Sequence, residues 1–235
     1  MMVSKHGFTL HVLGYTQNKP IYLLERSSTK SIAKNILIAS GFHGEEPAGP
    51  WGLLHALESL PSSVLDAVNI SFLPLVNISG FSLGKRLNHK NENPNRGFLP
   101  LLDGVHASEE ARVLLHHEVI LTDLGRDGVL SCHEDLASSY AYIYANEKGS
   151  TPSALALKLC DSHAQFFPLH FDGLVDNCKI NDGIVFNHRD SSFEAWLFQH
   201  GATASYCTET PGLADFKTRV HANAAMVRTF IEYHM

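Results

Sequence analysis

The sequence predicts an α/β protein: a three-layer αβα single domain covering residues 1–235, with a mixed, mostly parallel central sheet. Short apolar runs rich in β-branched residues alternate along the chain with amphipathic helical patterns, as in layered α/β folds. The chain has 235 residues, of which 44% are hydrophobic, so it can bury one sizeable core. No repeat, low-complexity tract or linker interrupts the alternation.

The first half of the chain begins with a loosely alternating segment at 8–26, which predicts a hairpin at a sheet edge. The apolar run 35–39 predicts a buried strand, and the helical pattern after it runs to about residue 60, where Pro61 ends it. Residues 69–77 predict the next strand. A strand, a helix and a second strand in this order are typical of a parallel sheet.

Residues 78–105 are dense in Gly, Asn and Pro and predict a long loop. Because long loops inside a compact domain are uncommon and usually functional, this segment is a candidate part of a site. Ser108 is expected to cap a helix that reaches about residue 122, and residues 128–133 and 140–144 predict two more strands.

The last third of the chain alternates in the same way, apart from a turn-rich stretch at 170–190 to which the pattern assigns no element. The expected elements are a helix over 151–167 with Pro152 in its first turn, a short helix over 191–197 that ends by Gly201, a strand over 202–208, and an amphipathic helix over 215–233.

The composition of the chain argues against several classes of protein. A formal net charge of −6 argues against general nucleic-acid binding, which needs a basic surface. No apolar run reaches the length of a membrane span, and the N-terminus lacks the features of a secretory signal, so we expect a cytoplasmic protein. The four cysteines are widely separated and are expected to be free thiols: Cys132, Cys160, Cys178 and Cys207.

The loop after the strand at 35–39 carries the strongest candidate metal ligands. His43 and Glu46 lie three residues apart where a strand of an open α/β sheet ends, which is where such sheets bind ligands. Glu45 is an alternative to Glu46, but the spacing favours Glu46. His133 closes another strand and is the natural third ligand. Three such ligands with a fourth position open to water are typical of one catalytic Zn²⁺ ion.

Other residues could supply the remaining chemistry of amide hydrolysis. Glu209 follows an apolar strand and is the candidate general base, which would take a proton from water and pass it to a leaving amine. The long loop offers cationic and polar groups. Arg86 could stabilise a developing oxyanion, while Asn95 and Arg96 could bind a substrate carboxylate.

The order of these parts resembles the zinc carboxypeptidase family, in the style of bacterial murein peptide amidases and of the succinylglutamate desuccinylase and aspartoacylase relatives. The resemblance rests on His43-x-x-Glu46, Asn77-x-x-Gly80, Arg86-x-Asn88, Asn95-Arg96, His133 and Glu209. It implies zinc bound by the two histidines and Glu46, Glu209 as general acid/base, Arg86 on the scissile carbonyl, and Asn95 with Arg96 on a substrate carboxylate.

Two departures from this family pattern stand out. Secreted digestive members carry a tyrosine on a mobile loop before the catalytic glutamate, whereas residues 180–190 offer Asn187 and His188 but no tyrosine. The aspartate usually found before the Asn-Arg pair is also missing, with Glu92 and Asn93 nearby. For these reasons we do not predict that this protein shares the substrate preference of the family.

The expected function is that of a zinc-dependent metallopeptidase of the carboxypeptidase or amidase type. It would hydrolyse an amide bond near a free carboxylate, with a murein-type peptide as one candidate substrate. The main alternative is an N-acyl amino acid amidohydrolase similar to aspartoacylase, because that group shares the metal ligands. A zinc- or peptide-binding module without catalysis is a third hypothesis. The expected partners are small peptides or acyl amino acids, with no nucleic acid and no membrane.

Overall fold

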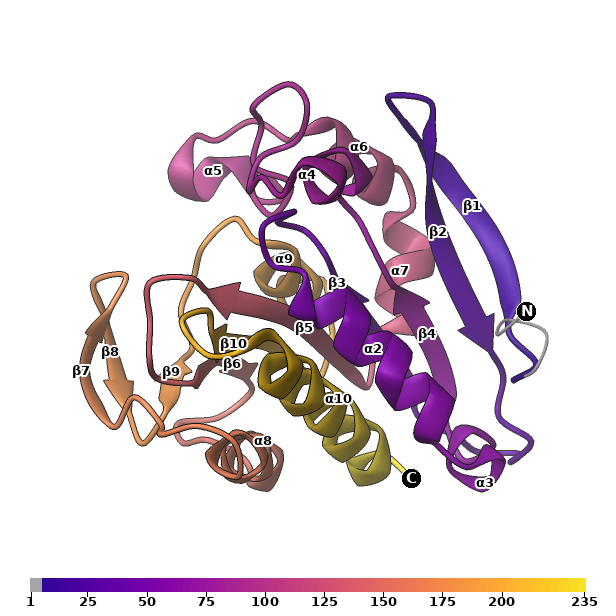
Figure 1. Cartoon of the computed structure of the whole chain (residues 1–235). Coiled ribbons are helices and arrows are strands. Elements are labelled where there is room, and N and C mark those ends of the chain that lie inside the picture. The colour runs from indigo at the N-terminus through magenta and orange to yellow at the C-terminus, as the bar shows by residue number, and fades with distance from the viewer. Residues whose placement is uncertain (1–5) are drawn as a thin grey trace.

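A ten-stranded sheet runs through the computed structural model, which describes residues 6–235 (Figure 1). The strand order is β1–β2–β4–β3–β5–β10–β6–β9–β8–β7. The strands are β1 (Thr9–Thr16), β2 (Lys19–Arg26), β3 (Asn35–Ser40), β4 (Asn69–Leu73), β5 (Gly128–Asp135), β6 (Tyr142–Glu147), β7 (Asp172–Val175), β8 (Cys178–Asn181), β9 (Ile184–Phe186) and β10 (Ala204–Pro211).

The centre of the sheet is parallel and its flanks are mostly antiparallel. β3 lies between β4 and β5, and β10 lies beside β5, all in parallel register. β1 and β2 form an antiparallel hairpin at one edge, and β7, β8 and β9 are antiparallel at the other. The α/β fold with a mixed sheet is confirmed, and the predominance of parallel pairing holds for the central strands. Their carboxyl ends meet along one edge of the sheet.

Helices cover both faces of this sheet, which gives the three expected layers (Figure 1). One apolar core packs α2 (Ala48–Ser59), α8 (Ala154–Ala164) and α10 (Phe216–Tyr233) on one face. A second core packs α6 (Glu109–His116), α7 (Glu118–Leu124) and α9 (Phe193–Gln199) on the other. Three further short helices are α3 (Ser62–Leu65), α4 (Ile78–Leu83) and α5 (Pro100–Asp103).

Local sequence explains why these elements form where they do. β3 is buried on both sides over its whole length, as expected for a central strand made of Ile, Leu and Ala. Several helices begin at a side chain that accepts a backbone N–H: Ser108 caps α6, Ser192 caps α9 and Asp215 caps α10. The predicted cap at Ser108 is therefore confirmed.

Apart from shifts of two or three residues at the ends of other elements, the structure differs from the expected elements in four places. β4 stops at Leu73 because Pro74 cannot donate a ladder hydrogen bond. The 78–105 segment is not entirely loop, since it contains α4 and α5. The helix expected to reach residue 122 is interrupted at His117, which separates α6 from α7. The stretch 170–190 forms β7, β8 and β9, whose tight turns at 176–177 and 182–183 dominate its composition.

Two expectations from composition can be compared with the described residues. All four cysteines are free thiols, as predicted. Over residues 6–235, none of the helices combines the length and the apolar character that a bilayer span requires.

His163 in α8 makes stability depend on pH. Its side chain is fully buried, and neither ring nitrogen has a hydrogen-bond partner among the described residues. Burial lowers the pKa of His163 to about 3. Between pH 6.5 and 3 the unfolded chain therefore binds a proton that the native protein does not. The native state loses stability as pH falls through this window and keeps it above pH 6.5.

The His163→Leu variant is expected to remove this acid sensitivity. At pH 5, which is 1.5 pH units below the ordinary histidine pKa, the free energy of unfolding of the wild type should be lower by about 2 kcal/mol because His163 stays unprotonated in the native state. We therefore expect the difference in the free energy of unfolding between the variant and the wild type to shift by that amount in favour of the variant as the pH falls from 8 to 5. Urea unfolding in the presence of a chelator measures both proteins at both pH values. Parallel pH slopes for the two proteins would contradict this account.

Candidate metal centre

The loop that carries His43 and Glu46 follows the carboxyl end of β3, and two glycines set its shape. Gly41 has a φ of 68°, a left-handed conformation that favours glycine, and its carbonyl accepts from Asn77 N–H at 2.8 Å. Gly44 lies against α4, where an added Cβ would stand 1.9 Å from the Gly80 carbonyl carbon. The loop therefore packs closely on the start of α4. This packing fixes the direction of the side chains on either side of Gly44.

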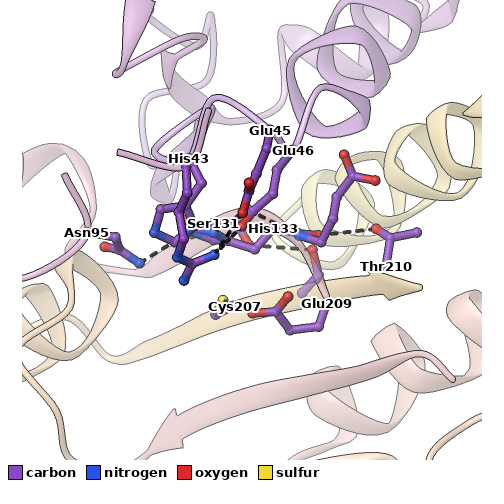
Figure 2. Close-up of polar contacts among 12 residues, drawn as sticks. His43, Glu45, Glu46, Asn95, Ser131, His133, Cys207, Glu209 and Thr210 are labelled. Atoms are coloured by element: carbon purple, nitrogen blue, oxygen red, sulfur yellow. Dashed lines mark hydrogen bonds and ion pairs between the residues drawn. The ribbon is translucent and has the colours of Figure 1, made fainter. Parts of the chain in front are cut away.

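The structure brings His43, Glu46 and His133 together, as predicted, although they come from two different strand ends (Figure 2). The three ligand atoms all lie within 4.8 Å of one another, and all three side chains are buried. Glu46 Oε1 is 2.6 Å from His43 Nδ1, and Glu46 Oε2 is 2.8 Å from His133 Nδ1. Both imidazoles thus turn the same nitrogen, Nδ1, toward one carboxylate.

The pKa values in this cluster are set by burial and by the charges of the neighbouring side chains. Burial alone would raise the pKa of Glu46, but the two histidines hold it far below its usual range. Burial would likewise lower the pKa of His133, but Glu46 and Glu194 raise it to about 10. His43 has its pKa lowered by burial. Two imidazoles and a carboxylate are also the ligand types that zinc prefers, so these residues fit the ion.

Glu45 does not join the cluster. Its carboxylate lies 3.8 Å from Arg86 Nη1, while Glu46 is the residue held between the histidines. Asn93 occupies the outer side of His43, where its Oδ1 lies 3.0 Å from Nε2. An amide oxygen thus stands near the position at which the family resemblance suggested an aspartate.

A cavity of about 290 Å³ opens beside the cluster and contains the other predicted site residues. Its lining includes His43, Arg86, Asn95, Arg96, His133 and Glu209. Glu209 lies on β10 directly across from His133 in the β5–β10 register, with Cys207 beside it (Figure 2). Removal from water, together with the nearby charge of Glu46, raises the pKa of Glu209. The site therefore holds an ionisable group next to the cluster without adding a fourth ligand to it.

The loop residues of the cavity already have partners within the chain. Arg86 Nη1 lies 3.0 Å from Glu46 Oε1, so its guanidinium borders the cluster. Arg96 donates to the Asn95 carbonyl at 2.7 Å and lies 3.2 Å from Asp190 Oδ2. Asn95 is buried, and its Oδ1 accepts from Phe193 N–H at 2.9 Å. Their roles in binding a substrate stay predictions.

Sequence reasoning missed several side chains of the cavity, of which Glu194 is the most deeply buried. Glu194 is the second residue of α9, and no spacing motif links it to His133, which is far away in sequence. The lining also includes Tyr144, Asn146, Asp176, His188, Asp190, Ser192 and Cys207. His188 and Asp190 lie in the stretch 180–190, in which the sequence offers no counterpart of the tyrosine of the family's secreted members.

The start of α2, next to the loop that carries His43 and Glu46, is held by a buried ion pair. Glu134 accepts from Ala48 N–H at 2.7 Å and pairs with Arg219 of α10. The Glu134 side chain is 0% exposed and that of Arg219 is 12% exposed. Glu134 N–H also donates to Glu46 Oε2 at 3.3 Å, so the residue after His133 supports both the helix and the cluster.

The Arg219→Met variant is expected to lose about 3 kcal/mol of stability, because removing one member of a buried pair leaves the other charge without compensation. Urea unfolding measures the loss. The double variant Glu134→Gln/Arg219→Met is the matched control and should recover most of it, since it removes the buried charge as well. A single variant within 0.5 kcal/mol of the wild type, roughly the range of ordinary surface substitutions, would show that the pair contributes little.

Buried histidine and glutamate side chains at the ends of parallel strands, with a further carboxylate and two arginines in one cavity, are typical of a metallohydrolase site. The model of the zinc carboxypeptidase family matches residues 5–158 of the chain, and the chain belongs to that family. Membership of this family implies a bound metal ion, typically zinc, and supports the classification of the protein as a hydrolase.

Solved structures agree with this assignment. A protein from Shewanella amazonensis SB2B, provisionally assigned as a metallopeptidase, superposes with a TM-score of 0.94 and 42% identity over 99% of this chain and 89% of that one. A counterpart from Shewanella denitrificans OS217 gives a TM-score of 0.93 and 44% identity, with 99% and 86% covered.

A more distant likeness is the murein-tripeptide amidase MpaA from Escherichia coli O157. It has a TM-score of 0.67 and 18% identity, with 96% of this chain and 92% of that one covered, and it shares the fold. Comparison with curated protein sequences gives no match.

Proposed function

We propose that the protein is a zinc-dependent metallopeptidase of the carboxypeptidase or amidase type that hydrolyses an amide bond near a free carboxylate. One observation carries the proposal. His43, Glu46 and His133 are buried around one point, in a cavity that also holds Glu209, Arg86 and Arg96. A cavity of about 290 Å³ suits one terminal residue of a peptide or a small acyl amino acid better than a protein chain.

Zinc held by the two histidines and Glu46 would polarise the scissile carbonyl and make water more acidic. In our proposal Glu209 takes the proton from the attacking water and then gives it to the departing amine. Its position across from His133 and its raised pKa both suit a group that must hold a proton during one step. Arg86, which borders Glu46, donates to the oxygen on which negative charge develops.

Arg96 is proposed to bind the substrate carboxylate, which would replace Asp190 as the partner of its guanidinium. A bidentate guanidinium–carboxylate pair fixes orientation as well as charge, and the present 3.2 Å contact with Asp190 keeps the guanidinium at the cavity wall. The amide bond next to the bound carboxylate would then lie toward Glu209 and Arg86.

The Arg96→Ala variant is expected to raise KM for a substrate with a free carboxylate by about 10- to 100-fold, the equivalent of losing one or two charged hydrogen bonds. Its kcat and zinc content should change little. The same peptide with an amidated C-terminus is the matched control, because its KM should be nearly equal in both proteins. Equal KM values for the free-acid substrate in the two proteins would remove Arg96 from the carboxylate site.

A substrate panel tests the proposed reaction itself. The zinc-loaded protein would be offered a murein tripeptide, unrelated dipeptides and tripeptides with free or amidated C-termini, and N-acylated aspartate and glutamate. We expect hydrolysis of free-acid peptides. Selective cleavage of the acyl amino acids would favour the N-acyl amino acid amidohydrolase instead, and zinc and peptide binding without any hydrolysis would favour a binding module.

A further inference from the structure

His133 is contacted on both sides of its ring by carboxylates. Its Nδ1 lies 2.8 Å from Glu46 Oε2, on the side of the proposed ion, and its Nε2 lies 3.4 Å from Glu194 Oε1 on the opposite side. Glu194 takes no part in the chemistry proposed above. It is nevertheless a buried carboxylate in direct reach of a metal ligand, and such a charge needs a physical reason.

The state of the His133 ring decides what Glu194 can do. An imidazole that binds a cation through Nδ1 carries its proton on Nε2, so Nε2 must meet a hydrogen-bond acceptor. Asn95 Nδ2 is 3.3 Å from Nε2, but it is a donor, because Asn95 Oδ1 already accepts from Phe193 N–H at 2.9 Å. Among the described residues that contact Nε2, Glu194 alone offers an acceptor.

Glu194 is held in place by its surroundings, and among the residues described it has no lysine or arginine to pair with. Ser192 caps α9, and the Glu194 carbonyl accepts from Ser205 Oγ of β10 at 2.9 Å. Its carboxylate also accepts from Asn95 Nδ2 at 3.3 Å. Both groups that face this carboxylate, His133 Nε2–H and Asn95 Nδ2, are hydrogen-bond donors, as an ionised carboxylate requires.

The other histidine of the cluster is supported differently. His43 Nε2 faces Asn93 Oδ1 at 3.0 Å, and that atom is the amide oxygen because Asn95 N–H donates to it at 3.0 Å. One metal ligand is therefore backed by a neutral amide and the other by a full negative charge. A carboxylate behind a ligating imidazole fixes the tautomer and makes the ring a stronger donor to the metal.

We propose that Glu194 is a positioning residue that holds His133 from the side opposite the metal and strengthens its bond to the ion through its charge. This proposal rests on the metal site of the proposed function. It concerns metal affinity and not the reaction. Its test therefore does not depend on knowing the substrate.

The experiment measures the dissociation constant for zinc by competition with a chromophoric chelator. It compares the wild type with Glu194→Gln, Glu194→Ala and Asn93→Asp. We expect affinity to fall about 10-fold in Glu194→Gln, which keeps an acceptor but loses the charge, and up to about 100-fold in Glu194→Ala. Asn93→Asp should bind zinc more tightly, and it should restore part of the loss when combined with Glu194→Gln.

A second readout is the visible absorption of the cobalt-substituted proteins, which should shift in the Glu194 variants because the His133 donor is altered. Circular dichroism of the metal-free proteins checks that each variant folds. If either folded variant keeps wild-type zinc affinity and cobalt spectrum, the proposal is overturned, even if hydrolysis falls; Glu194 would then act on the substrate. If the wild type itself fails to bind zinc, the metal site of the proposed function is overturned together with the role of Glu194. If the wild type binds zinc and the Glu194 variants bind it equally well, only the role of Glu194 is overturned.

Discussion

The Glu209→Gln variant is expected to lose about 10³-fold in kcat, within the range that a positioned general acid/base contributes, and to keep its zinc. Glutamine has nearly the same shape but can neither accept a proton from water nor return one to an amine. Because Glu209 lies on β10 and is not one of the clustered ligand residues, the ion should stay bound. Steady-state kinetics with a free-acid peptide, together with zinc analysis of the same preparation, measures both effects.

Glu209→Asp provides a graded control, since it keeps the proton chemistry but withdraws the carboxyl group from the cavity by one methylene. Its rate should lie between those of the wild type and Glu209→Gln. A Glu209→Gln protein with a kcat within threefold of the wild type would show that another group carries the proton, and the assignment of Glu209 would be wrong.

The His133→Ala variant is expected to lose both metal and turnover. Removing one of three buried ligands leaves only the two ligands of the 43–46 turn, too few for the three-ligand site of a catalytic zinc. We expect zinc to fall from about one ion per chain to near none after dialysis, and hydrolysis to fall to background. Elemental analysis and activity assays on the dialysed protein check the result.

His163→Leu is the matched control for His133→Ala, because His163 is also a fully buried histidine but is not one of the clustered ligand residues. It should keep full zinc and activity at pH 8. Loss of zinc in both variants would point to a general effect of histidine removal on the fold. Retention of zinc by His133→Ala would exclude His133 as a ligand.

Much of this site could be predicted because its ligands lie at the ends of recognisable strands. His43 lies three residues after β3 and His133 lies near the end of β5, and parallel strands must bring those ends to one edge of the sheet. The His-x-x-Glu spacing places Glu46 on the same turn. Topology and spacing together were enough to bring the three residues to one point.

The supporting residues could not be predicted in the same way. Glu194 reaches His133 only because α9 packs on the face of the sheet next to β5 and β10, which no local pattern encodes. Asn93 and Asn95 lie in a segment without regular structure, where side-chain to backbone hydrogen bonds decide the conformation. The strands at 172–186 are short and separated by two-residue turns, so their turn residues hid the strand pattern.

The central claim is that one cation binds between His43, Glu46 and His133. X-ray diffraction from crystals grown with zinc, with data collected on both sides of the zinc absorption edge, tests it most directly. We expect one strong anomalous peak about 2.0–2.2 Å from Nδ1 of each histidine and from a carboxylate oxygen of Glu46. A peak at another place, or zinc-saturated crystals without a peak between these three side chains, would contradict it.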